Sequence, residues 1–110
     1  MRTMDLDGYA VVETDERLDA LSAPALKEAV TGVVRGAEQP LVIIDLAGTR
    51  FIDSSGCGAL VAALRSVVAN GGDMKICSPS AQARDLFELT RLDRVFRIFG
   101  SRGEAVDSFG

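Results

Sequence analysis

Residues 51–60, FIDSSGCGAL, contain the side chains with which this chain could most readily do chemistry. Phe51 and Ile52 lead into Asp53, two serines follow, and two glycines flank Cys57. A serine can serve as a nucleophile, as a helix cap or as a site of phosphorylation, and each use makes different demands on its neighbours. The segment therefore allows three interpretations, which the rest of the chain must separate.

A nucleophilic serine would need a base, and the chain offers none nearby. It contains no histidine, and no lysine lies within residues 51–60, although these are common activating groups. A phosphate-binding loop is also disfavoured, because Gly56-Cys57-Gly58 lacks the lysine and the spacing of a Walker loop. Cys57 and Cys77 do not form a Cys-x-x-Cys pair, so a zinc site is not expected either. We therefore expect no enzymatic activity, no metal and no cofactor.

Two interpretations remain for the serines. In the simpler one, Ser54 or Ser55 is the N-cap of a helix, and Gly56 and Gly58 let that helix approach neighbouring backbone closely. In the other, an exposed serine at the helix N-terminus accepts a phosphate, whose charge the free N–H groups and the helix dipole would tolerate. Such a phosphate would repel an acidic partner and obstruct close packing, so it would switch binding without unfolding the protein.

Length and composition limit the class of protein. The chain has 110 residues, 47% hydrophobic residues and a net charge of −4 with a pI near 4.7. This length fits a single domain, residues 1–110. An acidic chain is a poor ligand for nucleic acid. The longest apolar runs, such as ALVAAL, are too short to span a bilayer, and no signal-peptide pattern begins the chain. We therefore expect a cytoplasmic protein with no nucleic-acid or membrane partner.

Strand and helix patterns alternate along the chain. Asp7-Gly8 predicts the turn of a hairpin over residues 3–14. A helix should follow Ser22 as N-cap, with Leu21 and Leu26 forming a hydrophobic staple. The remaining elements are a buried strand at LVIIDL, a helix over 54–69, a strand at DMKICS, a helix opened by Ser78-Pro79, a strand at RVFRIF, and a short helix opened by the capping-box spacing of SRGE.

The predicted order is β-β-α-β-α-β-α-β-α, which indicates an α/β fold. Such an order favours right-handed crossovers and a mixed, largely parallel sheet of four to five strands with about four helices. Ligands and partners of these sheets meet the loops at the carboxyl ends of the strands. We expect a group of polar residues to crowd this one edge: Asp19, Asp45, Asp53, Ser54 and Ser55.

A longer stretch, LVIIDLAGTRFIDSSGCGALVAALRSVVANGGDMKICSPS, resembles the STAS domain of bacterial anti-sigma factor antagonists. The shared pattern is a strand, an Asp-Ser-Ser/Thr-Gly-x-Gly turn and an apolar helix. The likeness extends to RLDALSAPAL near residue 20 and to LTRLDRVFRIFGSRGEAV near the end of the chain. The ordered set of three segments is much more specific than the short motif alone, and it implies a single STAS-like domain.

The resemblance implies a partner-switching function. Proteins of this family bind a serine kinase that doubles as an anti-sigma factor, and so release the sigma factor. The kinase uses ATP to phosphorylate the first serine of the motif, which ends binding, and a serine phosphatase restores it. By motif this serine is Ser54, with Ser55 as its neighbour and N-cap. The partner-binding residues implied are Asp19, Asp53, Ser54, Ser55, Gly56 and Cys57.

Two residues depart from the family pattern. Glu16 stands where the family usually has glycine before its x-Leu-Asp element, and Cys57 occupies the middle of Gly-x-Gly. Cys57 is either a small buried residue or a thiol of lowered pKa at a helix N-terminus, open to oxidation. A Cys57–Cys77 disulfide would require their α-carbons to lie within about 7 Å.

The resemblance also leaves an alternative function. Some proteins with this fold are scaffolds of stressosome-like assemblies or regulators of lipid-transport complexes, but these often lack the serine. Asp53-Ser54-Ser55-Gly56 therefore favours the switch. No long exposed apolar stripe demands a permanent dimer, so we expect a monomer or a weak dimer.

Overall fold

The computed structural model describes residues 1–109 and begins with the predicted hairpin. Strands β1 (Arg2–Leu6) and β2 (Tyr9–Glu13) pair antiparallel. Asp7 and Gly8 between them both have positive φ, 53° and 89°, which is the backbone of a tight hairpin turn. The hairpin prediction is confirmed.

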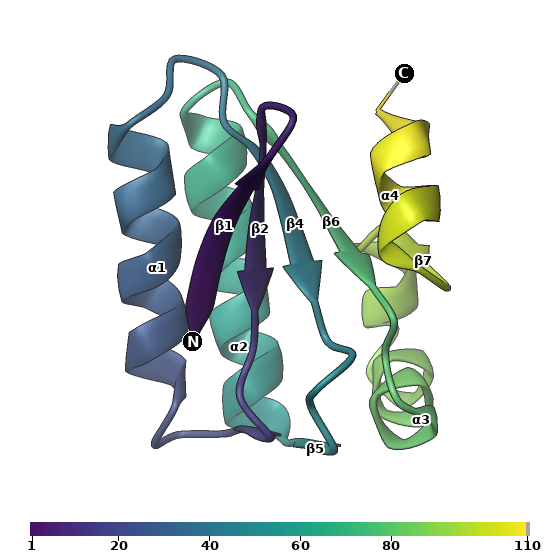
Figure 1. Ribbon diagram of the computed structural model, residues 1–110. Helices are drawn as coiled ribbons and strands as arrows, with labels where there is room; N and C mark the ends of the chain where they lie inside the picture. Colours follow the sequence, from purple (N-terminus) through teal and green to yellow (C-terminus); the bar gives the residue numbers. More distant parts are fainter. Residues whose placement is uncertain (110) are drawn as a thin grey trace.

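Three further strands extend this hairpin into a five-stranded sheet (Figure 1). They are β4 (Leu41–Asp45), β6 (Asp73–Cys77) and β7 (Ile98–Phe99), and the order across the sheet is β1-β2-β4-β6-β7. All neighbours except β1 and β2 are parallel. The sheet is therefore mixed and largely parallel, as predicted.

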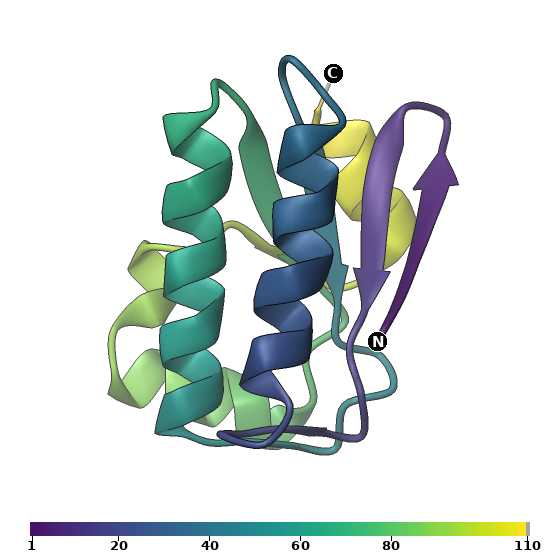
Figure 2. The same cartoon turned by 90° about the vertical axis from the view of Figure 1, so that its left-hand side faces the viewer.

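Helices cover both faces of this sheet. Helices α1 (Ala23–Arg35) and α2 (Ser54–Ala69) lie side by side on one face, and α4 (Arg102–Ser108) lies on the other (Figures 1 and 2). Helix α3 (Ala81–Leu89) and a short 3₁₀ turn, η1 (Leu92–Arg94), connect β6 to β7. No helix within residues 1–109 combines the length and the apolar character needed to cross a membrane.

The alternation of side chains along the strands produces two hydrophobic clusters. The larger cluster fills the space between the sheet and α1 and α2, and includes Val12, Ile44, Leu26 and Leu60. The smaller cluster lies beneath α4 and includes Val11, Ile43, Cys77 and Ala105. Because neighbours such as Val11 and Val12 point to opposite faces, both faces of the central strands are apolar.

A second, two-stranded sheet was not predicted. Strand β3 (Arg17–Leu18) pairs in parallel with β5 (Phe51–Ile52), immediately before α1 and α2 respectively. Strands of two residues are too short for an alternating pattern to be recognised. This pair carries the two loops that hold the polar residues predicted for the site.

Several predicted details were wrong at the ends of elements. Helix α3 begins after Ser80, whose hydroxyl accepts from the Ala83 N–H, and not after Ser78, whose φ of 55° is left-handed. In RVFRIF only Ile98–Phe99 forms a strand. The hydroxyl of Ser101 caps α4 as predicted, but Glu104 accepts from the Gly100 N–H.

Some large apolar side chains are exposed. The exposed fractions of Val68, near the end of α2, and Leu89, at the end of α3, are 55% and 82%. Leu21 is 93% exposed, whereas Leu26 is fully buried, so the predicted staple does not form. Leu21 lies in the loop between β3 and α1, where its backbone N–H is bonded to Asp19.

Candidate functional site

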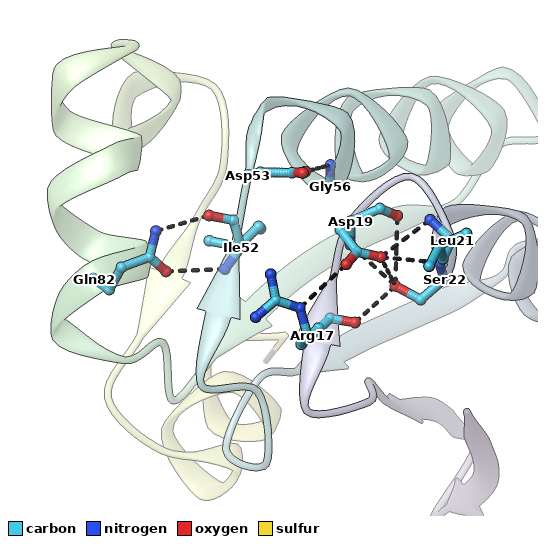
Figure 3. Close-up of polar contacts among 8 residues, drawn as sticks. All are labelled: Arg17, Asp19, Leu21, Ser22, Ile52, Asp53, Gly56 and Gln82. Atoms are coloured by element: carbon cyan, nitrogen blue, oxygen red, sulfur yellow. Dashed lines mark hydrogen bonds and ion pairs between the residues drawn. The ribbon is translucent and has the colours of Figure 1, made fainter.

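Asp53, and neither serine, caps helix α2. Its backbone is extended (φ −118°, ψ −172°), and its Oδ1 accepts a hydrogen bond of 2.9 Å from the Gly56 N–H (Figure 3). The prediction of Ser54 or Ser55 as N-cap was therefore wrong, because the residue preceding them supplies the acceptor. Ser54 and Ser55 occupy the first turn, and both are exposed.

Gly56 lets the start of α2 lie against β3. A Cβ at this position would collide with the carbonyl oxygen of Leu18 and would lie 2.8 Å from Cγ1 of Ile52. The Asp53 N–H also donates to the Leu18 carbonyl, at 3.3 Å. The expected close backbone approach is confirmed for Gly56 but not for Gly58, which has open space around its α-carbon.

Cys57 belongs to the core. It is 5% exposed and packs in the larger hydrophobic cluster. Burial raises the pKa of the Cys57 thiol, and the nearby charge of Asp53 raises it further, so the hypothesis of a thiol with lowered pKa was wrong. Cys77 lies in the other cluster, beneath α4, and both cysteines are free thiols. Gly56 and Cys57 are both buried, unlike the exposed Ser54 and Ser55.

Asp19 organises the loop between β3 and α1 (Figure 3). Its Oδ1 accepts from the backbone N–H groups of Leu21 (3.0 Å) and Ser22 (3.3 Å), and its Oδ2 accepts from Nε of Arg17 (3.3 Å). Burial alone would raise the pKa of Asp19, but the hydrogen bonds from Ser22, Arg17 and Leu21 outweigh it and leave that pKa below its usual value.

Ser22 occupies the N-cap position of α1 without capping it through its side chain. Its backbone is helical, and its hydroxyl donates to the carbonyl of Arg17 at 2.7 Å. The Asp19 carboxylate does not replace this cap, because it accepts from the N–H groups of Leu21 and Ser22, which precede the helix; the Asp19 carbonyl accepts from the Ala23 N–H. Leu21 lies between these two residues, and the loop directs it away from the core.

Gln82 is a residue of this region that the sequence did not suggest. From α3, its Oε1 accepts from the Ile52 N–H at 2.9 Å and its Nε2 donates to the Ile52 carbonyl at 2.7 Å (Figure 3). The amide therefore bonds β5 as a neighbouring strand would. A glutamine in the first turn of a helix carries no sequence signal for a partner 30 positions away.

Asp45 does not belong to this site, although it ends β4 at the same side of the sheet. It is 5% exposed, and its Oδ2 lies 2.8 Å from the Arg102 guanidinium, which also contacts Glu13 at 2.8 Å. The hydrogen bond with Asp45 and the nearby Glu13 raise the pKa of Arg102. Asp45 therefore anchors α4, and the expected crowding of all the acids at one surface was wrong.

Glu16 does not disturb the turn where the family usually has glycine. The non-glycine residues with positive φ within 1–109 are Asp7, Ser78 and Arg91, so this position does not require glycine's conformational freedom. The Glu16 carbonyl accepts from the N–H groups of Arg50 and Phe51. Glu16 therefore helps to align β3 with β5 through its backbone.

A groove of about 540 Å³ runs between α1 and α2. Ala20, from the Asp19 loop, and Ser55, from the start of α2, both line it. The two loops therefore form one continuous surface: the Asp19 loop, the exposed serines and the start of the groove. The residues that line the groove are mainly small and apolar: Ala20, Ala23, Pro24, Lys27, Val30, Thr31, Ser55, Ala59, Ala62, Ala63 and Ser66.

The arrangement suits binding and modification. Two exposed hydroxyls lie at the N-terminus of a 16-residue helix, where unpaired N–H groups and the helix dipole favour an added negative charge.

Comparison with known proteins agrees with this fold. The sequence model of the STAS domain matches residues 2–105. An anti-sigma-B factor antagonist from Listeria monocytogenes is 32% identical over 87 residues, covering 79% of this chain and 75% of that protein. The crystal structure of an anti-sigma factor antagonist from Mycobacterium paratuberculosis is 28% identical, with a TM-score of 0.86, and the match covers 97% of this chain and 90% of that one.

The same fold occurs in SpoIIAA, an anti-sigma factor antagonist solved in unphosphorylated and phosphorylated forms. The unphosphorylated form is 20% identical with a TM-score of 0.79, covering 98% of this chain and 94% of that one. The phosphorylated form, from Bacillus, is 21% identical with a TM-score of 0.73, covering 99% and 98%. The match of the STAS domain model to residues 2–105 shows that the chain belongs to the STAS domain family.

Proposed function

We propose that this protein is an anti-sigma factor antagonist that binds a serine-kinase anti-sigma factor and is released when Ser54 is phosphorylated. The proposal rests on the different positions of two neighbouring residues at the start of α2: Asp53 caps the helix, and Ser54 lies exposed beside it. The Ser54 hydroxyl can therefore be modified without removing the cap. The names of the Listeria and Mycobacterium relatives, and the phosphorylated form of SpoIIAA, support this function.

The switch would be electrostatic. A phosphate on Ser54 adds roughly two negative charges next to Asp53, at a helix end that can accept them. The fold should therefore survive phosphorylation, while a partner packed on this surface would meet new charge and bulk. A serine phosphatase would reverse the change. In this role the protein regulates transcription in the cytoplasm as a monomer or weak dimer, and it catalyses no reaction itself.

Ser55 provides a matched control for Ser54, because both hydroxyls are exposed in the same helical turn. The protein would be incubated with the serine-kinase anti-sigma factor of its own host and ATP, and the phosphorylated residue located by mass spectrometry. We expect phosphate on Ser54 in the wild type and in Ser55→Ala, and none in Ser54→Ala.

Binding gives the second measurement. Ser54→Ala should bind the kinase and stay bound when ATP is added, whereas Ser54→Glu should bind poorly at the same thermal stability. Phosphate on Ser55, or on neither serine, would refute the assignment of Ser54.

A further inference from the structure

Leu21 is the most exposed large apolar residue within 1–109, at 93%. Exposed leucines are common on protein surfaces and by themselves indicate nothing. This one, however, occupies a position from which it could have folded onto Leu26 and the core, as the spacing of a hydrophobic staple predicts. The Asp19 loop holds it outward instead.

The loop holds Leu21 through its backbone. The backbone N–H groups of Leu21 and Ser22 both donate to Oδ1 of Asp19, and the Ser22 hydroxyl donates to the Arg17 carbonyl (Figure 3). An apolar side chain on a loop fixed in this way loses little conformational freedom on binding, which favours its use as an interface anchor.

Leu21 also lies next to the surface around Ser54. The Leu18 carbonyl accepts from the Asp53 N–H, so the two loops begin from one hydrogen-bonded pair of strands. Ala20, the residue before Leu21, lines the same groove as Ser55. A protein that covers Ser54 would thus meet Leu21 in the same contact.

Both oxygens of the Asp19 carboxylate already accept hydrogen bonds within the loop, so little of the carboxylate is free to bind a partner directly. Its side chain is 17% exposed, one oxygen accepts two backbone N–H groups, and the other pairs with Arg17. What the loop presents outward is Leu21.

Resting on the proposed function, we propose that Leu21 is an apolar anchor that enters a hydrophobic pocket of the anti-sigma kinase, and that Asp19 is a positioning residue that holds Leu21 in place. Contact at Leu21 supplies affinity, whereas Ser54 beside it supplies the switch. The partner surface should therefore combine an apolar pocket with the kinase's catalytic cleft.

Leu21→Ala tests the anchor, with Val68→Ala as its control. Val68 is also exposed, at 55%, but lies in the last turn of α2, at the opposite end of the helix from Ser54. Leu21→Ala should raise the Kd for the kinase about tenfold, as truncation of an interface anchor does, and raise KM for phosphorylation while kcat at saturation is kept. Val68→Ala should leave both unchanged, and neither variant should lower Tm.

Asp19→Asn and Asp19→Ala test the positioning role. Asparagine keeps a side-chain oxygen that can accept from the Leu21 N–H but removes the charge, and alanine removes both. We expect Asp19→Asn to bind nearly as the wild type does, and Asp19→Ala to bind as weakly as Leu21→Ala. Hydrogen exchange of the Leu21 amide should be faster in Asp19→Ala alone.

The outcomes separate this inference from the proposed function. A wild-type protein that neither binds nor is phosphorylated by the kinase would refute the function. Normal binding by the wild type together with unchanged binding by Leu21→Ala would refute the anchor alone. If Asp19→Asn lost as much binding as Asp19→Ala, the partner would be recognising the negative charge of Asp19 directly. That result would refute the positioning role.

Discussion

Asp53 follows β5 and Asp45 ends β4; both carboxylates accept from a backbone N–H, but of the two only Asp45 also pairs with a cation. Asp53 accepts from the backbone N–H of Gly56 at the β3–β5 edge, the region formed by residues 17–22 and 51–56. Asp45 pairs with the side chain of Arg102 on the α4 face, the side of the sheet that α4 covers. The Asp53 hydrogen bond caps α2, and the Asp45–Arg102 pair holds α4 against the sheet.

The difference extends to the neighbours of each aspartate. At the β3–β5 edge, Asp19 and Gln82 likewise bond to backbone groups, which fixes very short strands and leaves Ser54 and Leu21 exposed. On the α4 face, Arg102 pairs with Asp45 and Glu13, and Lys75 donates to the Ser108 hydroxyl. Side chain–backbone bonds therefore maintain an exposed surface at the β3–β5 edge, whereas bonds between side chains join α4 to the sheet.

The largest effect should come from removing the close approach that forms the edge. Gly56→Ala would press a methyl group into the Leu18 carbonyl and should destabilise the protein by about 3 kcal/mol. Gly58→Ala is the control, because open space surrounds Gly58 and alanine should stabilise the helix by about 0.5–1 kcal/mol. Urea unfolding measures both, and similar stabilities for the two variants would contradict this account of the edge.

The second largest effect tests the α4 face. Arg102→Met would leave Asp45, which is 5% exposed, without its cation. Breaking a fully buried pair costs about 3–5 kcal/mol, and because the Arg102 side chain is 30% exposed we expect about 2 kcal/mol here. Adding Asp45→Asn should restore part of the loss. Kinase binding should stay unchanged in the folded variants, and a loss of binding would show that the two regions are coupled.

Gln82→Leu should have a smaller effect, confined to the β3–β5 edge. It removes both hydrogen bonds to Ile52 and should cost about 1 kcal/mol. Gln82→Glu is the matched variant, since a carboxylate can still accept from the Ile52 N–H but cannot donate to the Ile52 carbonyl. Hydrogen exchange at the Ile52 amide should be fastest in Gln82→Leu. Unchanged exchange there would mean that pairing with β3 is sufficient to hold β5.

The smallest effect is a pH dependence on the α4 face. Lys75 is 1% exposed; its Nζ donates to the Ser108 hydroxyl and lies 3.9 Å from the centre of the Phe109 ring. Burial lowers the pKa of Lys75, the charge of Arg97 lowers it further, and Asp73 opposes them.

The sign of the effect follows from this lowered pKa. Between the pKa of folded Lys75 and the ordinary value of about 10.5, the unfolded chain binds more protons, so stability should rise with pH. Lys75→Met should remove this rise. Urea unfolding of the two proteins between pH 8 and 10.5 measures the difference, and parallel curves would contradict it.

Local patterns predicted most of the fold because they extend over many residues. Helix α2 begins at Ser54 and ends at Ala69 as predicted, since a long apolar repeat precedes the stop signal of Asn70-Gly71-Gly72, where Gly71 has a φ of 77°. The hairpin was equally clear from Asp7-Gly8. By contrast, β3 and β5 have two residues each, and their pairing depends on contacts between distant parts of the chain.

The candidate site was predicted only in part for the same reason. The motif placed Asp53 and the two serines at the start of a helix, but not which of them caps it. No local pattern linked Gln82 to Ile52, or Asp45 to Arg102 57 positions away.

The sequence by itself determined the order of the four helices and of the strands of the main sheet, the helix that begins at Ser54, and the lack of a histidine base. The tertiary structure decided which polar group each aspartate binds, that Cys57 and Cys77 lie in clusters on opposite faces, and that Leu21 points outward. The physical reason is that periodicity along one element predicts which side of it is buried. The partner of a polar side chain, however, depends on which distant segment folds against it.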